Sequence, residues 1–347
     1  MSTRIGFNRQ QNSVTSAEFY QEQQLPASIL QDLNSAAAET EFEIAANTRR
    51  SYKASFDIFC HYCQQHQLNS LPADPRVVVA FIGQQKDIYL DQTESQLSKQ
   101  TLISRLAAIR FFHIEAGYNS PTEHPMVLRV MRGIGRNQHR DIQDYDQQPI
   151  MYDELEMLLS AIEENNSHLQ AVRDKAIFQL AFQGGFRRSE IAAIQVSHLT
   201  FLRQKLKVRL PYSKANQSGV REWKDLPQDE PFSAYDAIKQ WLALTGIDDG
   251  HLFRSISRNG LKLRPYFLKQ ANDPKSKNSG FLNGDDIYRL VKKYSALAGL
   301  PTQFFGAHSL RSGCVTQLYE NDKDHLYIMA RTGHTDPRSL RHYLKPK

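Results

Sequence analysis

The sequence predicts a mainly α-helical protein of two domains, with a small antiparallel β-sheet in the second domain. Three observations predict this class. Apolar residues recur at three- and four-residue steps over most of the chain, which is typical of amphipathic helices. One stretch, residues 205–210, alternates apolar and basic side chains as a half-buried strand does. A length of 347 residues with 40% hydrophobic residues suffices for two packed cores.

Residues 1–46 are expected to form a flexible N-terminal tail. They are rich in Gln, Ser, Asn and Ala, and they contain two basic and six acidic residues. The tail therefore carries a net charge of −4, which leaves +10 on the rest of a chain whose total is +6. Such an excess of basic residues is compatible with a polyanion as partner. The chain has neither a hydrophobic signal segment nor a long apolar run, so we expect a cytoplasmic protein.

Residues 47–140 are predicted to form a domain of four helices. The first begins with Thr48 as N-cap, and the second has Asp74 as N-cap and Pro75 as first helical residue. The third ends at Gly117. The helix faces opposite the apolar ones carry basic side chains that we expect to contact a polyanion: Lys99, Arg105, Arg110, Arg132 and Arg136.

Cys60 and Cys63, with His61 and His66 nearby, superficially resemble metal ligands. No second CxxC or HxxxH follows at the distance of a zinc site. Both cysteines also belong to the apolar pattern of the first predicted helix. We therefore expect them to pack in the core and to bind no metal.

A linker at residues 141–149 is predicted to precede the second domain, residues 150–347. Helices are expected at 152–164 and 172–182, followed by a break at Gly184 and Gly185 and a new helix that starts at Arg187. The strand at 205–210 and its return strand form a hairpin with Lys214 at the tip. Arg258 lies in a basic turn further along.

The last forty residues combine groups that suit phosphodiester cleavage. His308 and Arg311 are three residues apart in a predicted helix, so they share one face. His334 and Tyr343 follow, nine residues apart, and Asp336 caps the short helix expected to carry the tyrosine. Metal-free cleavage needs cations for the phosphate oxygens, a nucleophile and an acid for the leaving oxygen. Arginines bind phosphate and favour the phenolate, so this stretch indicates a tyrosine that attacks a DNA phosphate without metal or cofactor.

Three motifs of the second domain carry a family resemblance. The stretch "FRRSEIAAI" places an arginine, one residue, a small residue and a glutamate in the order of a first box, which selects Arg187 rather than Arg188 and adds Glu190. "AHSLRSG" matches a second box and "GHTDPRSLRHY" a third. In this order the motifs resemble the tyrosine recombinase family of phage and plasmid integrases, in its Cre-like form. The similarity spans residues 47–347.

The resemblance implies a role for each matched residue. Tyr343 is the expected nucleophile, which forms a 3′-phosphotyrosyl intermediate. Arg187 and Arg311 are expected to clamp the scissile phosphate, to which His334 donates a hydrogen bond.

Three further residues complete the implied site. His308 is expected to assist proton removal from the phenol, and Glu190 to orient its neighbours. Lys214, at the hairpin position of the family's lysine, is expected to protonate the leaving 5′ hydroxyl. Lys207 and Lys224 lie on the same hairpin, so the choice of lysine stays open.

The resemblance also implies an assembly. A helical core DNA-binding domain and the catalytic domain form a clamp around double-stranded DNA with an inverted-repeat core site. We expect a dimer on one site and a synaptic tetramer that exchanges strands through a Holliday junction. We also expect a nucleoid-associated location, and an accessory protein that sets the direction of recombination is compatible with this assembly. The alternatives are DNA relaxation of the type IB topoisomerase kind and a catalytically inactive DNA-binding protein.

Two departures from the family pattern concern the ends of the chain. In Cre-like proteins a further C-terminal helix docks on the neighbouring subunit, whereas only residues 344–347 follow Tyr343 here. Either the sequence is truncated at this end or another element makes the contact, and our hypothesis is that part of the acidic, Gln-rich tail does so. The tail is too short and too acidic to resemble an arm-binding domain, which implies that only core sites are recognised.

Overall fold

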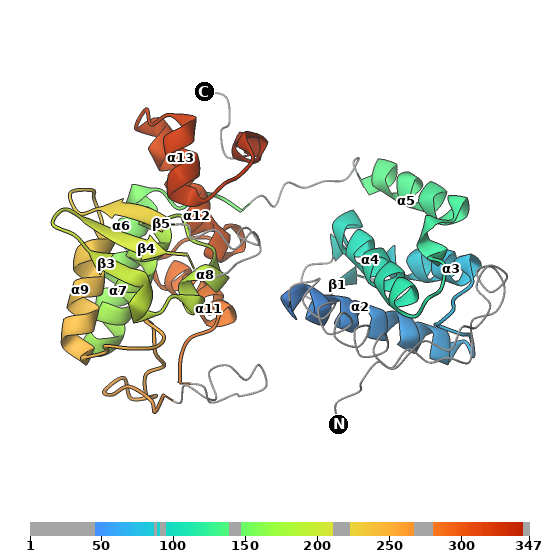
Figure 1. Cartoon of the computed structure of the whole chain (residues 1–347), viewed down its shortest axis with the longest axis horizontal. Helices are drawn as coiled ribbons and strands as arrows, with labels where there is room; N and C mark the ends of the chain where they lie inside the picture. Colours follow the sequence, from blue (N-terminus) through green and yellow to red (C-terminus); the bar gives the residue numbers. More distant parts are fainter. Residues whose placement is uncertain are drawn as a thin grey trace, which may run out of the picture. The chain divides into compact units, whose positions relative to one another are not determined.

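The computed structural model describes residues 46–86, 89–90, 95–138, 147–210, 223–266 and 280–342. The chain divides into two compact units, Met1–Gln143 and Asp144–Lys347, and each is described by itself (Figure 1). The described residues are mostly helical, with one three-stranded antiparallel sheet in the second unit. The mainly α class with a small sheet is therefore confirmed. No helix in these ranges is long and apolar enough to cross a membrane.

The part of the first unit that the structure describes has four α-helices. Its elements are α2 Ala46–Gln65, α3 Pro75–Lys86, β1 Tyr89–Leu90, β2 Ser95–Gln96, α4 Lys99–Glu115, η2 Pro121–Glu123 and α5 Pro125–Gln138. Their buried faces meet in one core, in which the rings of Phe59 and Phe81 are 5.1 Å apart. Asp74 accepts the backbone N–H of Arg76 at the start of α3, as predicted for its N-cap. Thr48 is not an N-cap, because α2 already includes Ala46.

Cys63 lies in this core, as predicted. It is 1% exposed, and Cys60 is only partly buried on the same helix. Burial, and then the proximity of Cys60, raises the pKa of the Cys63 thiol to about 11. The thiol therefore stays protonated and packs as a small apolar group.

A buried histidine joins the segment before α3 to α4. Nε2 of His113 accepts the backbone N–H of Ala73 at 2.9 Å, and Nδ1 is 2.7 Å from the carbonyl oxygen of Ile109. An acceptor at Nε2 requires the neutral ring with its proton on Nδ1. Burial lowers the pKa of His113, which favours the same neutral form.

In the described part of the second unit, helices pack around one hydrophobic core together with the small sheet. Its elements are α6 Tyr152–Glu164, α7 His168–Gln183, α8 Arg188–Ala193, η3 Val196–His198, β3 Leu199–Phe201, β4 Lys205–Arg209, β5 Trp223–Pro227, α9 Ala234–Thr245, α11 Gly284–Leu297, η4 Thr302–Phe304, α12 Ala307–Glu320, α13 His325–Thr332 and η5 Pro337–His342. α7 is central, since it is buried along most of its length and packs against α6, α9 and α12 (Figure 1). The indole N–H of Trp241, on α9, donates to the carbonyl of Leu252 and fixes α9 to the chain that follows it.

The small sheet has the order β3-β4-β5, with both pairs antiparallel. Leu206 and Val208 of β4 face the core, and they pair with Leu226 and Lys224 of β5. The two hairpin strands were predicted, whereas β3 was not. The helix expected to start at Arg187 is short. That helix ends at Ala193, because the following chain is held extended by bonds to the segment at 250–252.

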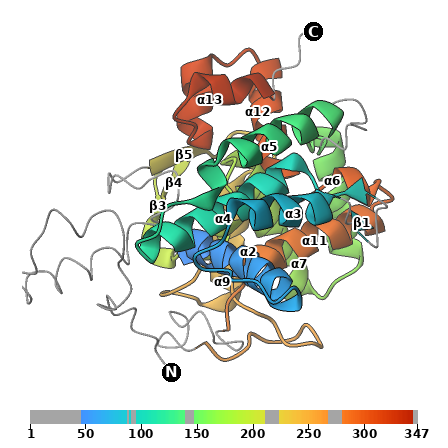
Figure 2. The same cartoon turned by 90° about the vertical axis from the view of Figure 1, so that its right-hand side faces the viewer.

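Helix α13 is fixed by a largely buried ion pair. Figures 1 and 2 show α13 and α12 side by side in the second unit, and α13 also packs against β5. Arg331 of α13 is 4% exposed and contacts both carboxylate oxygens of Glu230, at 2.8 and 2.7 Å. It also donates to the carbonyl of Gln183 at the end of α7. The guanidinium thus joins α13, α7 and the segment after β5.

We expect the His113 contact to weaken as pH falls. Because the folded pKa of His113 is lowered, its contribution is full above the unfolded value of about 6.5 and is lost as pH falls below it. Hydrogen-exchange protection factors of peptides from α3 and α4 should therefore decrease between pH 7.5 and 5. His113→Gln should lower protection at pH 7.5 and flatten this dependence. An equally steep dependence in the variant would contradict the expectation.

Glu230→Gln should destabilise the second unit by about 3 kcal/mol, because it leaves Arg331 buried without its counter-charge. The exposed pair of Lys205 and Asp225 provides the control, since Asp225→Asn should cost less than about 1 kcal/mol. Urea unfolding followed by tryptophan fluorescence reports on this unit, which contains Trp223 and Trp241. Equal midpoints for the two variants would show that the Glu230 pair contributes no more than a surface contact.

Candidate active site

Arg187 projects from a tight turn between α7 and α8. Gly185 has φ +53°, and a Cβ at this position would lie 2.8 Å from the side chain of Thr332, so the turn admits glycine only. The carboxylate of Glu190 is buried and accepts both the backbone N–H of Arg187, at 2.9 Å, and its guanidinium, at 2.7 Å. This contact fixes a guanidinium that is 39% exposed.

Arg311 is the buried centre of the site. It is 1% exposed, and its Nη1 donates to the carbonyl oxygens of Gly185, at 2.5 Å, and Thr332, at 2.6 Å. These carbonyls belong to the turn before Arg187 and to the end of α13. The guanidinium therefore connects two segments that are far apart in sequence, and its Nη2 lies 3.0 Å from Nε2 of His334.

The contacts of His334 determine its tautomer. Arginine can only donate, so Nε2 of His334 accepts from Arg311. The proton is then on Nδ1, which donates to the hydroxyl of Thr332 at 2.6 Å, and that hydroxyl donates in turn to the carbonyl of Ile328. Burial, followed by the charges of Arg311 and Arg187, lowers the pKa of His334 to about 3. The imidazole is thus neutral.

His308 lies at the edge of a cavity of about 440 Å³. The cavity is lined by Gln147, Arg187, Arg188, Ser189, Tyr288, Ala307 and His308. Partial desolvation, and then the charges of Arg311 and Arg187, lower the pKa of His308. Because His308 is neutral, the positive charge at the cavity comes from Arg187 and Arg188, and these guanidiniums suit a bound anion.

Lys224 is buried next to the turn before Arg187 and the end of α13. Its Nζ donates to the carbonyl oxygens of Gly184, at 2.6 Å, and Thr332, at 3.1 Å. The ammonium also lies 4.2 Å from the ring centroid of Phe186. Burial is the main cause that lowers the pKa of Lys224, to about 7, while Glu190 opposes the shift.

The structure brings together Arg187, Glu190, His308, Arg311 and His334: Glu190 contacts Arg187, and the charges of Arg187 and Arg311 contribute to the lowered pKa of both histidines. Lys214 and Tyr343 lie outside the described residues. The same is true of the acidic tail to which we assigned a docking contact.

The basic residues predicted to bind DNA have different surroundings. Lys99, Arg132, Arg136 and Arg258 are exposed. Arg110 is half exposed and pairs with Glu123. Arg105 is half-buried, and burial lowers its pKa.

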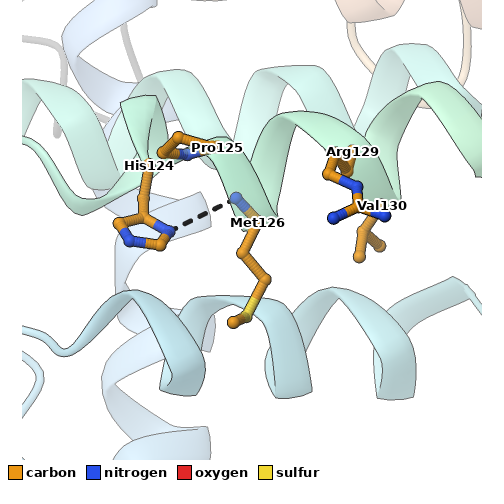
Figure 3. Close-up of a pocket in the computed structure, with 5 residues that line it drawn as sticks. All are labelled: His124, Pro125, Met126, Arg129 and Val130. Atoms are coloured by element: carbon orange, nitrogen blue, oxygen red, sulfur yellow. Dashed lines mark hydrogen bonds between the residues drawn. The ribbon is translucent and has the colours of Figure 1, made fainter.

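A second cavity, of about 530 Å³, lies on α5 in the first unit (Figure 3). It is lined by His124, Pro125, Met126, Arg129 and Val130. His124 accepts the backbone N–H of Met126 at 3.3 Å. None of the predicted catalytic or DNA-binding residues that the structure describes lines this cavity.

Two supporting residues gave only weak signals in the sequence. Lys224 occupies an inward-facing position of β5, in phase with Leu226, so alternation along the strand could have identified it as buried. Thr332 precedes the third box by one residue, and nothing in the sequence indicates that its carbonyl accepts from both Lys224 and Arg311.

Comparisons with known proteins agree with this geometry. Residues 149–347 match the phage integrase family. The integrase/recombinase XerD homolog of Selenomonas ruminantium is 31% identical over 306 residues, which cover 87% of this chain and 82% of that protein.

Solved structures show a similar fold. The Tn1549 transposon integrase in complex with transposon right end DNA has a TM-score of 0.55 at 15% identity, with 91% of this chain and 94% of that chain covered. A lambda integrase dimer bound to a COC′ core site has a TM-score of 0.52 at 14% identity, with 92% and 81% covered. The fold, the arginine and histidine cluster and the matched family together establish that the chain belongs to the phage integrase family of tyrosine recombinases.

Proposed function

We propose that this tyrosine-type site-specific DNA recombinase cleaves and rejoins DNA through a 3′-phosphotyrosyl intermediate on Tyr343. The observation that carries the proposal is the cluster of Arg187, Arg311 and two neutral histidines, in which Arg311 contacts His334 while Arg187 and His308 line one cavity. Two guanidiniums suit the non-bridging oxygens of a scissile phosphate, on which negative charge increases during the attack.

Arg311 is already held in place before DNA binds. Its Nη1 is occupied by two backbone carbonyls, so a phosphate oxygen would accept from Nη2, beside His334. In the absence of DNA, Nε2 of His334 is an acceptor and cannot donate to phosphate. Burial, and then the guanidinium charges, lower the pKa of His334, and the negative charge of a bound phosphate would oppose the part that the guanidiniums contribute. An imidazole protonated in this way would donate to the phosphate from Nε2.

The remaining roles follow the same logic. His308, neutral because its pKa is lowered, assists proton removal from the phenol of Tyr343. Glu190 orients Arg187 through the two bonds that its carboxylate accepts. Lys214 protonates the leaving 5′ oxygen.

DNA recognition is assigned to both units. The first unit is the core DNA-binding domain and the second is the catalytic domain. Lys99, Arg105, Arg110, Arg132, Arg136 and Arg258 contact the phosphate backbone of an inverted-repeat core site. Support comes from the related fold of the Tn1549 and lambda integrases, which were solved with DNA. Two sites, each with a dimer, form a synaptic tetramer that exchanges strands through a Holliday junction.

Tyr343→Phe should bind DNA like the unchanged protein and form no covalent adduct, because the phenolic oxygen is the only group removed. The measurement uses a random library of nicked duplexes, from which adducts are isolated under denaturing conditions and sequenced. Tyr319→Phe, in α12, is the matched control and should retain the adduct. An adduct from Tyr343→Phe would contradict the proposal.

The recovered DNA distinguishes the alternative activities. Inverted repeats around a short spacer support recombination. Adducts without a common sequence, together with relaxation of supercoils, would indicate a topoisomerase. Binding without any adduct from the unchanged protein would indicate an inactive DNA-binding protein.

Arg187→Gln should lower the single-turnover cleavage rate by about 10²- to 10³-fold, the effect of removing one donor from a transition-state oxyanion. Glu190→Gln should lower it less, because the amide oxygen still accepts the backbone N–H of Arg187 while its hold on the guanidinium weakens. Both rates are measured on the trapped DNA sequence at saturating protein. A Glu190 variant as slow as the Arg187 variant would show that Glu190 does more than orient the arginine.

A further inference from the structure

We propose that Lys224 is a positioning residue of the cleavage reaction, which ties the backbone before Arg187 to the backbone before His334 and thereby holds Arg311 in its phosphate-binding position. The inference rests on the proposed function of these three residues. Lys224 itself contacts no substrate.

Lys224 and Arg311 share one carbonyl acceptor, and their second acceptors are neighbours in the same turn. Lys224 donates to Gly184 and Thr332, and Arg311 donates to Gly185 and Thr332. Two cations from different elements, β5 and α12, therefore bind the same turn and the same end of α13. The carbonyl of Thr332 accepts from both of them, and the hydroxyl of Thr332 accepts the hydrogen bond that Nδ1 of His334 donates.

The position of Lys224 in the sheet makes its burial costly. It is 1% exposed and faces the core opposite Val208, in phase with Leu226. An apolar side chain at this position would avoid the desolvation of an amine, since lysine is rarely fully buried unless it is paired. The stabilisation of the ammonium comes from the two carbonyls and from the ring of Phe186, all of which adjoin the site residues.

A role as the general acid does not fit the location. The side chain of Lys224 is 1% exposed, and its Nζ already donates to two backbone carbonyls. A proton donor to the leaving oxygen must reach that oxygen directly or through a water. With its pKa at about 7, either protonation state of the amine retains two N–H groups for the two carbonyls.

The test compares Lys224→Met and Lys224→Arg with the matched control Leu226→Ala, which shortens a neighbouring buried side chain of β5 without touching the two carbonyls. Lys224→Met should lower the single-turnover cleavage rate by roughly 10- to 100-fold, as is usual when a supporting contact is removed. Lys224→Arg, which keeps the charge and the donors, should recover part of the rate. Thermal unfolding of each variant identifies the loss of rate that comes from destabilisation alone.

A substrate with sulfur in place of the leaving 5′ oxygen separates positioning from proton donation, because a thiolate leaves without protonation. Lys224→Met should stay slow on this substrate, whereas Lys214→Ala should be restored. Restoration of the Lys224→Met rate would overturn the proposal and make Lys224 the acid. A Lys224→Met rate equal to that of Leu226→Ala would also overturn it.

A measurement without DNA keeps this inference separate from the proposed function. In ¹⁵N-histidine-labelled protein, assigned with His334→Gln, the ring nitrogens of His334 should report an acceptor at Nε2 and a proton at Nδ1. Lys224→Met should shift these signals towards a mixture of tautomers, and Leu226→Ala should not. If the His334 signals of Lys224→Met were the same as those of the wild-type protein, the positioning role would be overturned. This outcome does not depend on whether the wild-type protein forms an adduct with any DNA.

Discussion

The site depends on the buried guanidinium of Arg311. It connects a turn at the end of α7 with the end of α13 through two carbonyl oxygens, and it contacts the imidazole of His334. An arginine this deeply buried is stable only where its donors are satisfied, and the fold supplies acceptors from two distant segments. The two hydrogen bonds that satisfy the guanidinium of Arg311 also fix its orientation. The same contacts therefore stabilise the fold and orient the group proposed to bind phosphate.

Burial and like charge together set the electrostatics of the site. Burial, and then the charges of Arg311, Arg187 and Lys224, lower the pKa of His334, and the buried carboxylate of Glu190 is already engaged by Arg187. In the DNA-free protein the histidines lose their charge, because an imidazole can become neutral whereas an arginine stays protonated. A polyanion restores the missing negative charge, so ligand charge and histidine protonation are coupled.

Much of this arrangement could be predicted from the sequence. The boundaries of α6 and the N-cap at Asp74 followed from apolar periodicity and capping residues, and five of the predicted site residues lie together. Strand β3 could not be predicted, because a three-residue strand has too little periodicity and depends on pairing with β4. The shared carbonyl of Thr332 and the tautomer of His334 could not be predicted either, since backbone acceptors carry no residue-type signal.

The register of β5 determines which side chain, and therefore which charge, faces the buried contacts of Arg311. Side chains alternate between the two faces of a strand, so a shift of β5 by one residue would exchange Lys224 for Asp225 or Trp223 at the inward position. A carboxylate there would compete with phosphate for the nearby guanidiniums, and an indole would leave the carbonyl of Gly184 without this donor. The pairing of Lys224 with Val208, a feature of a five-residue strand, thus keeps a carboxylate away from the buried guanidinium of Arg311 and supplies a donor to the carbonyl of Gly184.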